Sequence, residues 1–348
     1  MMTINEMVAM AKKDGASDIH VICGLPPKYR KDGQLENMCE EPLTKADCLE
    51  LSRWLAGDIY KEMEEIGELD LAGTYAGNRC RVHIFKQQGV PSIALRLLRE
   101  EIPDLTKLGL PPAAMKLPDM HKGIVLVTGE TGSGKSTTLA ALLDYVNHHR
   151  KAHIVTLEDP VEYLYKPDLC AINQREVGKD TRSFSDGLRA SLREDPNVIL
   201  IGEMRDRDTI ETAITAAETG HLVFGTLHTQ SAPDSIDRLV DVFPEERQQQ
   251  IRMQLSMTLN AVVSQQLIKK RGGGRVLAAE VMIVNAAIRN LIREGKTPQI
   301  ANTLATTADL GAITMDAALT KLVRSRLITK ENAIAAAHDP EQLRKVLR

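Results

Sequence analysis

One segment of eight residues constrains the fold of this chain more than any other. Gly129-Glu-Thr-Gly-Ser-Gly-Lys-Ser136 fits the pattern G-x-x-x-x-G-K-[ST]. The apolar run Ile124–Val127 before it predicts a buried strand, and apolar residues at helical spacing over 137–146 predict a helix after it. A strand, a glycine-rich turn and a helix in this order form a cradle in which backbone amides converge on a phosphate. The sequence therefore predicts a nucleoside triphosphate site in an α/β fold.

The residues of this cradle have distinct expected roles. Lys135 is expected to reach the β- and γ-phosphates, and Ser136 is expected to help hold Mg²⁺. Backbone amides of the turn and the partial positive charge of the helix start add to the attraction for phosphate. The residues expected to contact the nucleotide are Gly129, Glu130, Thr131, Gly132, Ser133, Gly134, Lys135, Ser136 and Thr137.

Composition argues against several other classes of protein. A net charge of −3 and 3% aromatic residues give no reason to expect a nucleic-acid partner. No apolar run approaches the ~20 residues that a membrane-spanning helix needs, and the first residues lack a signal-peptide core. The five cysteines are scattered without a C-x-x-C pair, so neither zinc nor a disulfide framework is indicated. We therefore expect a cytoplasmic protein without direct membrane insertion.

The first hundred residues have an α+β pattern without a nucleotide motif of their own. Helices are predicted at 4–12 and 49–63, and strands at 18–23, 79–85 and 91–98. Four prolines then punctuate a stretch with few long apolar runs, which we interpret as a linker over 101–118. The predicted domains are accordingly 1–100 and 119–348.

The second domain alternates strands with helices, which predicts a parallel sheet covered by helices. Its strands are predicted at 124–127, 153–157, 198–201 and 222–226. After Pro244 the chain is predicted to be mostly helical, interrupted by a basic turn at 269–275. We interpret that turn as a solvated hairpin tip rather than a nucleic-acid patch.

Carboxylates follow two of the predicted strands, where α/β folds place their ligands. Glu158 follows the strand at 153–157, and Glu203 follows the strand at 198–201. Gly202 occupies the place where many P-loop enzymes have an aspartate, so the carboxylate role falls on Glu203, together with Ser136 as a Mg²⁺ ligand. Either Glu158 or Glu203 would polarise the attacking water, and the sequence does not decide between them.

Histidines and arginines complete the set of candidate catalytic residues. His221 and His228 bracket the strand at 222–226, from which neutral imidazoles could sense the γ-phosphate or bind the acids. Arg79 and Arg81 lie on one face of a predicted strand. Phosphoryl transfer gains from a planar cation on the developing charge, commonly supplied by a neighbouring subunit.

Four segments resemble the secretion ATPase superfamily that drives type II secretion, type IV pili and archaeal flagella. Segments similar to its Walker A, Asp box, atypical Walker B and His box lie at 129–137, 156–162, 198–203 and 220–229. Ala287–Lys296 is similar to the AIRNLIRE signature of the pilus retraction ATPases, as are the shorter segments at 16–20, 193–196 and 202–206. The absence of a cysteine tetrad between Asp237 and Gln254 favours the same branch, because extension ATPases commonly carry zinc there.

The resemblance implies a PAS-like N-terminal domain followed by a RecA-like ATPase domain with C-terminal helices. It implies a homohexamer that hydrolyses ATP with Mg²⁺ to power type IV pilus retraction and twitching motility. A PilC-like platform protein of the inner membrane is the implied partner, with the ATPase docked at the inner face of the cytoplasmic membrane. Pilus extension or type II secretion is the alternative within the superfamily. A regulatory protein that uses ATP as a structural switch is the alternative of a different class.

The sequence departs from the family pattern at two positions. Glu130 stands where proline is usual in the Walker A turn. Because proline presets a turn dihedral, we expect a looser loop and weaker or slower nucleotide binding, but not its loss. His83 replaces the usual asparagine after the arginine strand, which changes a detail of the expected subunit contact.

Overall fold

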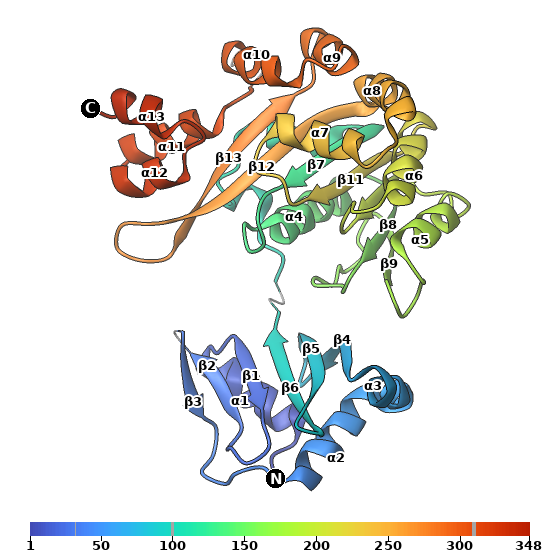
Figure 1. Cartoon of the computed structure of the whole chain (residues 1–348), viewed down its shortest axis with the longest axis vertical. Helices are drawn as coiled ribbons and strands as arrows, with labels where there is room; N and C mark the ends of the chain where they lie inside the picture. Colours follow the sequence, from blue (N-terminus) through green and yellow to red (C-terminus); the bar gives the residue numbers. More distant parts are fainter. Residues whose placement is uncertain (32, 99–100, 308–310) are drawn as a thin grey trace. The chain divides into compact units, whose positions relative to one another are not determined.

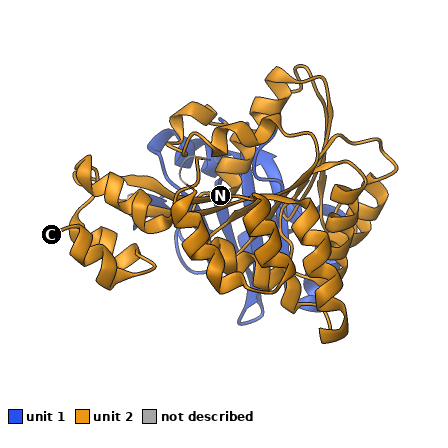
Figure 2. Ribbon diagram, turned by 90° about the horizontal axis from the view of Figure 1, so that it is seen from above, with its two compact units in different colours: residues 1–101, 160–164 blue, residues 102–159, 165–348 orange. Residues whose placement is uncertain are grey.

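The computed structural model describes residues 1–31, 33–98, 101–307 and 311–348, and the chain folds into two compact units (Figure 2). Unit 1 comprises Met1–Glu101 and Pro160–Leu164, and unit 2 comprises Ile102–Asp159 and Tyr165–Arg348. Residues 99 and 100, at the end of the predicted first domain, lie outside the described residues. No helix in the described ranges is long and apolar enough to cross a bilayer.

Unit 1 is built on a six-stranded antiparallel sheet with the order β3-β2-β1-β6-β5-β4 (Figure 1). Its elements are α1 (Ile4–Asp14), β1 (Asp18–Val21), β2 (Lys28–Lys31), β3 (Gln34–Asn37), α2 (Lys45–Ala56), α3 (Tyr60–Ile66), β4 (Glu68–Tyr75), β5 (Asn78–Gln87) and β6 (Val90–Leu97). The helix predicted at 49–63 is interrupted, because the chain turns at Gly57 with a φ of 53° between α2 and α3. Buried residues alternate along β5, as the sequence predicts for a half-buried strand.

Unit 2 contains a seven-stranded sheet with the order β13-β12-β7-β11-β10-β8-β9. Its strands are β7 (Gly123–Thr128), β8 (His153–Glu158), β9 (Ala171–Glu176), β10 (Val198–Ile201), β11 (Leu222–Leu227), β12 (Leu259–Lys269) and β13 (Arg275–Ile283). All neighbouring pairs are parallel except β12 with β13. The four predicted strands and the α/β class are confirmed.

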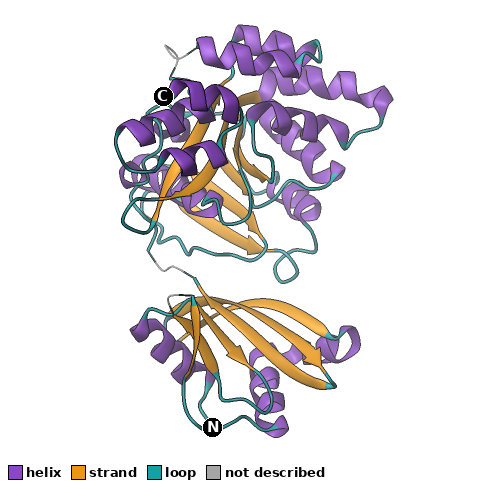
Figure 3. Cartoon of the chain, turned by 60° about the vertical axis from the view of Figure 1, so that its left-hand side comes forward, coloured by secondary structure: helices purple, strands orange, loops and turns teal. Residues whose placement is uncertain are grey.

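Helices pack around the strands of unit 2 (Figure 3). They are α4 (Lys135–His149), α5 (Phe184–Ser191), α6 (Arg207–Glu218), α7 (Ala232–Asp241), α8 (Glu245–Thr258), α9 (Ala286–Arg293), α10 (Ile300–Thr306), α11 (Met315–Arg324), α12 (Lys330–Ala336) and α13 (Pro340–Val346). Ile124 and Leu126 of β7 belong to a different apolar cluster from Val125 and Val127. Each face of the sheet therefore has its own core, which explains why the central strands are apolar throughout.

Two segments of unit 2 differ from the sequence-based expectations. The prediction of a mostly helical chain after Pro244 is wrong for β12 and β13, which form a hairpin whose first strand pairs with β7. The basic turn is the tip of this hairpin, with residues 271–275 exposed, as interpreted from the sequence. The stretch interpreted as a linker includes Leu105, Leu110 and Leu117, and these pack into a core cluster of unit 2.

Candidate nucleotide site

The phosphate cradle is the turn between β7 and α4. All six residues of β7 are buried, and α4 begins at Lys135 after Gly134, which has a φ of 95°. Gly129 has a φ of 138°, and a Cβ at this position would clash with the backbone oxygen of Gln265 on β12. Glycine is therefore required where the chain leaves the strand. The turn opens onto the first residues of a 15-residue helix, whose amides carry partial positive charge.

Lys135 and Ser133 lie inside this turn. The Lys135 ammonium donates to the carbonyl oxygens of Gly129 at 2.7 Å and Glu130 at 3.0 Å. The hydroxyl of Ser133 is buried and has no hydrogen-bond partner among the described residues. A charged ammonium and an unsatisfied hydroxyl surrounded by loop amides fit an anionic ligand with several acceptor oxygens.

A pocket of about 530 Å³ opens beside the cradle. Its lining includes the turn residues Gly129–Ser133, the β12 residues Gln265–Lys269, and Ala335–His338 near the end of α12. This volume lies within the range of small-molecule and cofactor sites. The β12 wall was absent from the sequence-based prediction, because β12 itself was not predicted.

Glu203 and His228 meet at the ends of two neighbouring strands. Glu203 follows β10, with 19% of its side chain exposed, and its Oε1 lies 3.1 Å from Nε2 of His228, which follows β11. Arg205 Nε donates to the same carboxylate oxygen. Two residues after His228, the Gln230 amide donates to the Glu130 carboxylate at 2.8 Å. The structure therefore brings Glu203 and His228 together. The hydrogen bond from Gln230 to Glu130 connects the segment after His228 to the Walker A turn.

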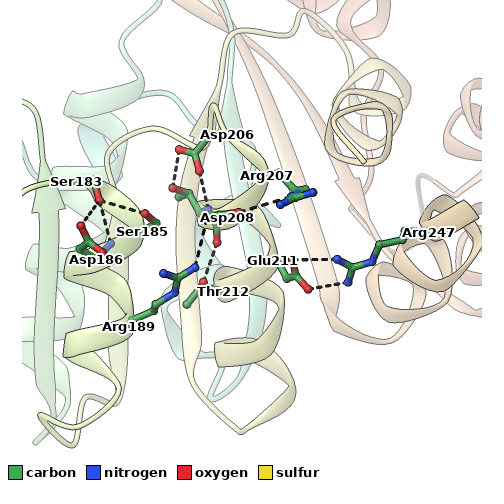
Figure 4. Close-up of polar contacts among 11 residues, drawn as sticks. Ser183, Ser185, Asp186, Arg189, Asp206, Arg207, Asp208, Glu211, Thr212 and Arg247 are labelled. Atoms are coloured by element: carbon green, nitrogen blue, oxygen red, sulfur yellow. Dashed lines mark hydrogen bonds and ion pairs between the residues drawn. The ribbon is translucent and has the colours of Figure 1, made fainter. Parts of the chain in front are cut away.

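The chain after Glu203 is fixed by polar contacts between helices (Figure 4). Asp206 caps α6 by accepting from the Thr209 amide at 2.9 Å. Glu211 on α6 accepts two hydrogen bonds from Arg247 on α8, at 2.7 and 3.3 Å. Arg189 lies 3.4 Å from the Asp208 carboxylate, which joins α5 to α6. These contacts restrain the start of α6 and with it the segment that carries Glu203.

Glu158 lies at the same edge of the sheet as Glu203. It is the last residue of β8, which pairs in parallel with β10. Its carboxylate accepts from the Thr156 hydroxyl at 2.7 Å and from the Gln174 amide at 3.3 Å. Both candidates for polarising water are therefore at the carboxyl ends of adjacent strands, and each has a side-chain donor that orients it.

His221 lies at the opposite edge of the sheet, and the structure does not bring it to the cradle. It precedes β11, and its backbone oxygen accepts from the amide of Gly123 at the start of β7. Its ring Nδ1 lies 2.9 Å from the Ala216 carbonyl and 3.2 Å from the Thr219 hydroxyl. Because a parallel strand rises about 3.3 Å per residue, the length of β11 separates His221 from His228 by roughly 20 Å.

Arg79 and Arg81 belong to unit 1. They lie on the face of β5 opposite the buried Cys80 and Val82, as alternation predicts. Arg79 Nε donates to the Val161 carbonyl at 3.1 Å, and the Arg81 guanidinium lies 3.8 Å from the Asp70 carboxylate. About half of the Arg81 side chain is exposed. Within unit 1 these two arginines therefore form part of a polar sheet face.

Gln230 and Gln265 are site residues that sequence reasoning missed. Gln230 holds Glu130, and the buried Gln265 side chain donates to the Thr138 hydroxyl on α4 at 2.8 Å. Gln230 lies only two residues beyond His228, so its proximity to the cradle could have been inferred once the strand order was known. Gln265 carried no signal, since a glutamine in a predicted helix is ordinarily a surface residue.

A parallel sheet with this cradle after β7 and an acid after β10, the next strand but one in the sheet, defines a P-loop nucleotide-binding protein. Residues 1–273 match the family described as "Type II/IV secretion system protein", and the chain belongs to that family.

Individual relatives in this family cover nearly the whole chain. The type IV pilus retraction ATPase PilT of Pseudomonas aeruginosa is 48% identical over 98% of this chain and 99% of the relative. The type IV pilus ATPase PilU of the same organism is 35% identical over 100% of this chain and 92% of the relative. A crystal structure of the pilus retraction motor PilT with bound ADP has a TM-score of 0.93 and 46% identity, covering 99% of this chain and 100% of that chain. The family predicted from the sequence is confirmed.

Proposed function

We propose that this chain is a Mg²⁺-dependent ATPase that powers the retraction of type IV pili. The observation that carries the proposal is the contact of 3.1 Å between the Glu203 carboxylate and the His228 ring beside a Walker A turn that contains Lys135. A complete set of phosphate-binding and acidic groups favours hydrolysis over a purely structural use of ATP. The identity to a retraction ATPase over nearly the whole chain favours retraction as the work done.

In the proposed mechanism, Lys135 and the amides of the turn bind the β- and γ-phosphates. The Ser136 hydroxyl and the Glu203 carboxylate would hold Mg²⁺, which supplies charge neutralisation at the phosphates. The described residues contain no group of three or more His, Cys, Asp or Glu side chains that would hold a metal by themselves. Two oxygen donors, from Ser136 and Glu203, would be enough for Mg²⁺ without such a cluster, because Mg²⁺ is usually bound by one or two protein oxygens with phosphates and waters.

Either Glu158 or Glu203 polarises the attacking water in this proposal. Glu203 is held by His228 and Arg205, whereas Glu158 is held by Thr156 and Gln174. Both carboxylates therefore stay candidates for the base in this proposal.

We further propose that the chain works as a homohexamer docked on a PilC-like platform protein at the inner face of the cytoplasmic membrane. The PAS-like part would span 1–100 and the RecA-like part 119–348, and the segment 101–118 would join them while it packs on unit 2 through Leu105, Leu110 and Leu117. Arg79 and Arg81 would reach a nucleotide bound to a neighbouring subunit. Their position on a partly exposed strand face supports a role at a surface that is completed by assembly.

The segment Ala287–Lys296 is proposed to transmit work to the pilus machinery. Ile288 and Ile292 of α9 are fully buried, so the helix is firmly seated in unit 2. Arg289 donates to the carbonyl oxygens of Ser256 and Met257 at the end of α8, whereas Arg293 is exposed. Arg293 and Lys296 therefore offer the charges with which a partner would make contact.

Deletion of the gene tests the direction of movement. If the chain retracts pili, the deletion strain should carry excess surface pili and should not twitch. Loss of surface pili would instead assign the chain to pilus extension. A steady-state phosphate-release assay on the purified protein, with and without Mg²⁺, separates an ATPase from an ATP-dependent switch, which would show no turnover.

A further inference from the structure

Glu280 is a buried carboxylate on β13, and the proposed mechanism has not used it. Only 3% of the residue is exposed. Its Oε1 accepts from the backbone amide of Ala232 at 2.9 Å, and its Oε2 accepts from that of Met315 at 3.3 Å. Ala232 and Met315 are the first residues of α7 and α11. The carboxylate therefore lies between two helix N-termini, whose partial positive charges stabilise an anion.

The helix start held by Glu280 is also the end of a loop in the nucleotide site. The residues His228–Ser231 connect β11 to α7. Within this loop His228 binds Glu203 at 3.1 Å and Gln230 binds Glu130 at 2.8 Å. Only three residues separate His228 from the amide that Glu280 fixes. A shift of Ala232 would therefore displace a loop that contacts both the acid after β10 and the Walker A turn.

We propose that Glu280 is a positioning residue for hydrolysis, which holds the loop His228–Ser231 so that His228 stays on Glu203. This inference rests on the proposed ATPase function, because the position of His228 affects turnover only if Glu203 serves the reaction. The second amide extends the same restraint to α11. Nδ1 of His338, in the wall of the pocket beside the cradle, lies 3.8 Å from the same carboxylate.

The surroundings of Glu280 explain why its loss should act on the loop and not only on the core. Burial raises the pKa of the Glu280 carboxyl, while the amides of Ala232 and Met315 and the ring of His338 oppose that rise. Each of the two Glu280 carboxylate oxygens accepts from its own backbone amide. A glutamine side chain has a single acceptor oxygen, so Glu280→Gln keeps the shape but leaves one of the two helix amides without its acceptor.

The test is a double-mutant cycle on the full chain, with kcat and KM for Mg²⁺-ATP measured by phosphate release. Glu280→Gln should lower kcat about 10-fold while KM changes less than about 2-fold. In a His228→Ala background the same substitution should lower kcat less than about 2-fold further, because the residue that it positions is gone. Equal reductions in both backgrounds, or a raised KM with unchanged kcat, would overturn the proposal.

A second variant removes the donor in place of the acceptor. Ala232→Pro removes the N–H that Glu280 binds and puts a ring carbon against the carboxylate, so the contact is lost, while proline still suits the first position of a helix. It should reproduce the loss of kcat and the same dependence on His228. This variant keeps the inference testable if Glu280→Gln does not fold, and full activity of a folded Ala232→Pro would contradict it.

Thr297→Val is the matched control for general loosening of α7. Thr297 is buried, and its hydroxyl lies 2.8 and 2.9 Å from the carboxylate oxygens of Asp237, which is farther along α7 than Ala232. This variant should lower the melting temperature while kcat stays within about 2-fold of wild type. If wild-type protein shows no phosphate release that depends on Lys135, the proposed function itself fails. If the wild type is active but the effects of Glu280→Gln and His228→Ala on kcat are additive, only the proposed role of Glu280 is refuted.

Discussion

The two edges of the seven-stranded sheet in unit 2 carry similar residue types in very different surroundings. At the carboxyl edge His228 binds the Glu203 carboxylate. At the amino edge His221 binds a helix carbonyl and a threonine hydroxyl. Both histidines flank the same strand, yet only His228 lies near the phosphate cradle, because β11 runs parallel to β7. Strand direction, and not residue type, separates a candidate catalytic histidine from a structural one.

Removal of the cradle cation is the change with the largest expected effect on turnover. Lys135→Ala should reduce ATP-dependent phosphate release to background, since the phosphates lose the main point charge within the turn. Lys122 is the matched control, because it is exposed directly before β7, the strand that leads into the cradle. Lys122→Ala should keep wild-type turnover. Similar losses in both variants would remove the distinction between the two edges.

Loss of the charge on Glu203 should be the next largest effect. Glu203→Gln keeps the side-chain shape, so a fluorescent ATP analogue should still bind while phosphate release falls roughly 10²–10³-fold. Glu158→Gln, assayed in parallel, shows which carboxylate polarises water. The base variant should bind Mg²⁺-nucleotide normally, whereas the metal-ligand variant should need more Mg²⁺ for half-maximal binding. Equal loss of binding and turnover in both would place neither acid in the hydrolytic step.

The two histidines test the comparison of the edges directly. His228→Ala should lower kcat about 10-fold or more, because Glu203 loses its contact with the His228 ring at the site. His221→Ala should leave kcat within about 2-fold. It should lower the free energy of unfolding by about 1 kcal/mol or less, as one lost hydrogen bond implies. Phosphate release and thermal melts measure the two quantities. A catalytic defect in a stably folded His221→Ala variant would show that the amino edge also takes part.

The extent of successful prediction differs along the chain for physical reasons. The turn at 129–136 was predictable because a phosphate cradle needs glycines and a lysine at fixed spacing between a strand and a helix. The strands β8, β10 and β11 were predictable as apolar runs, since both of their faces are buried.

Other features left little or no trace in the sequence. β12 begins at Leu259, directly after α8 ends at Thr258, without a glycine or proline between them. The apolar residues that follow therefore fitted a continued helix as well as a strand. The contacts of Glu280 could not be predicted at all, because its hydrogen-bond donors are backbone amides brought together only by the tertiary fold.

The smallest expected effect concerns the unusual residue of the Walker A turn. Glu130→Pro should restore the preset dihedral and remove a negative charge, at the cost of the contact with Gln230. We expect about 2- to 5-fold tighter nucleotide binding, the range that a rigidified loop provides, with little change in kcat. Titration with a fluorescent ATP analogue measures the affinity. Weaker binding would mean that the contact between Glu130 and Gln230 organises the turn better than proline does.

The central claim is that ATP hydrolysis at the carboxyl edge of this sheet powers pilus retraction, and labelled pili in living cells test it most directly. The deletion strain would be complemented with the wild-type gene or with Glu203→Gln at equal protein levels, and individual retraction events would be counted. We expect normal retraction with the wild type, and extended pili that do not retract with Glu203→Gln. Retraction at the wild-type frequency in cells that carry only Glu203→Gln would contradict the account.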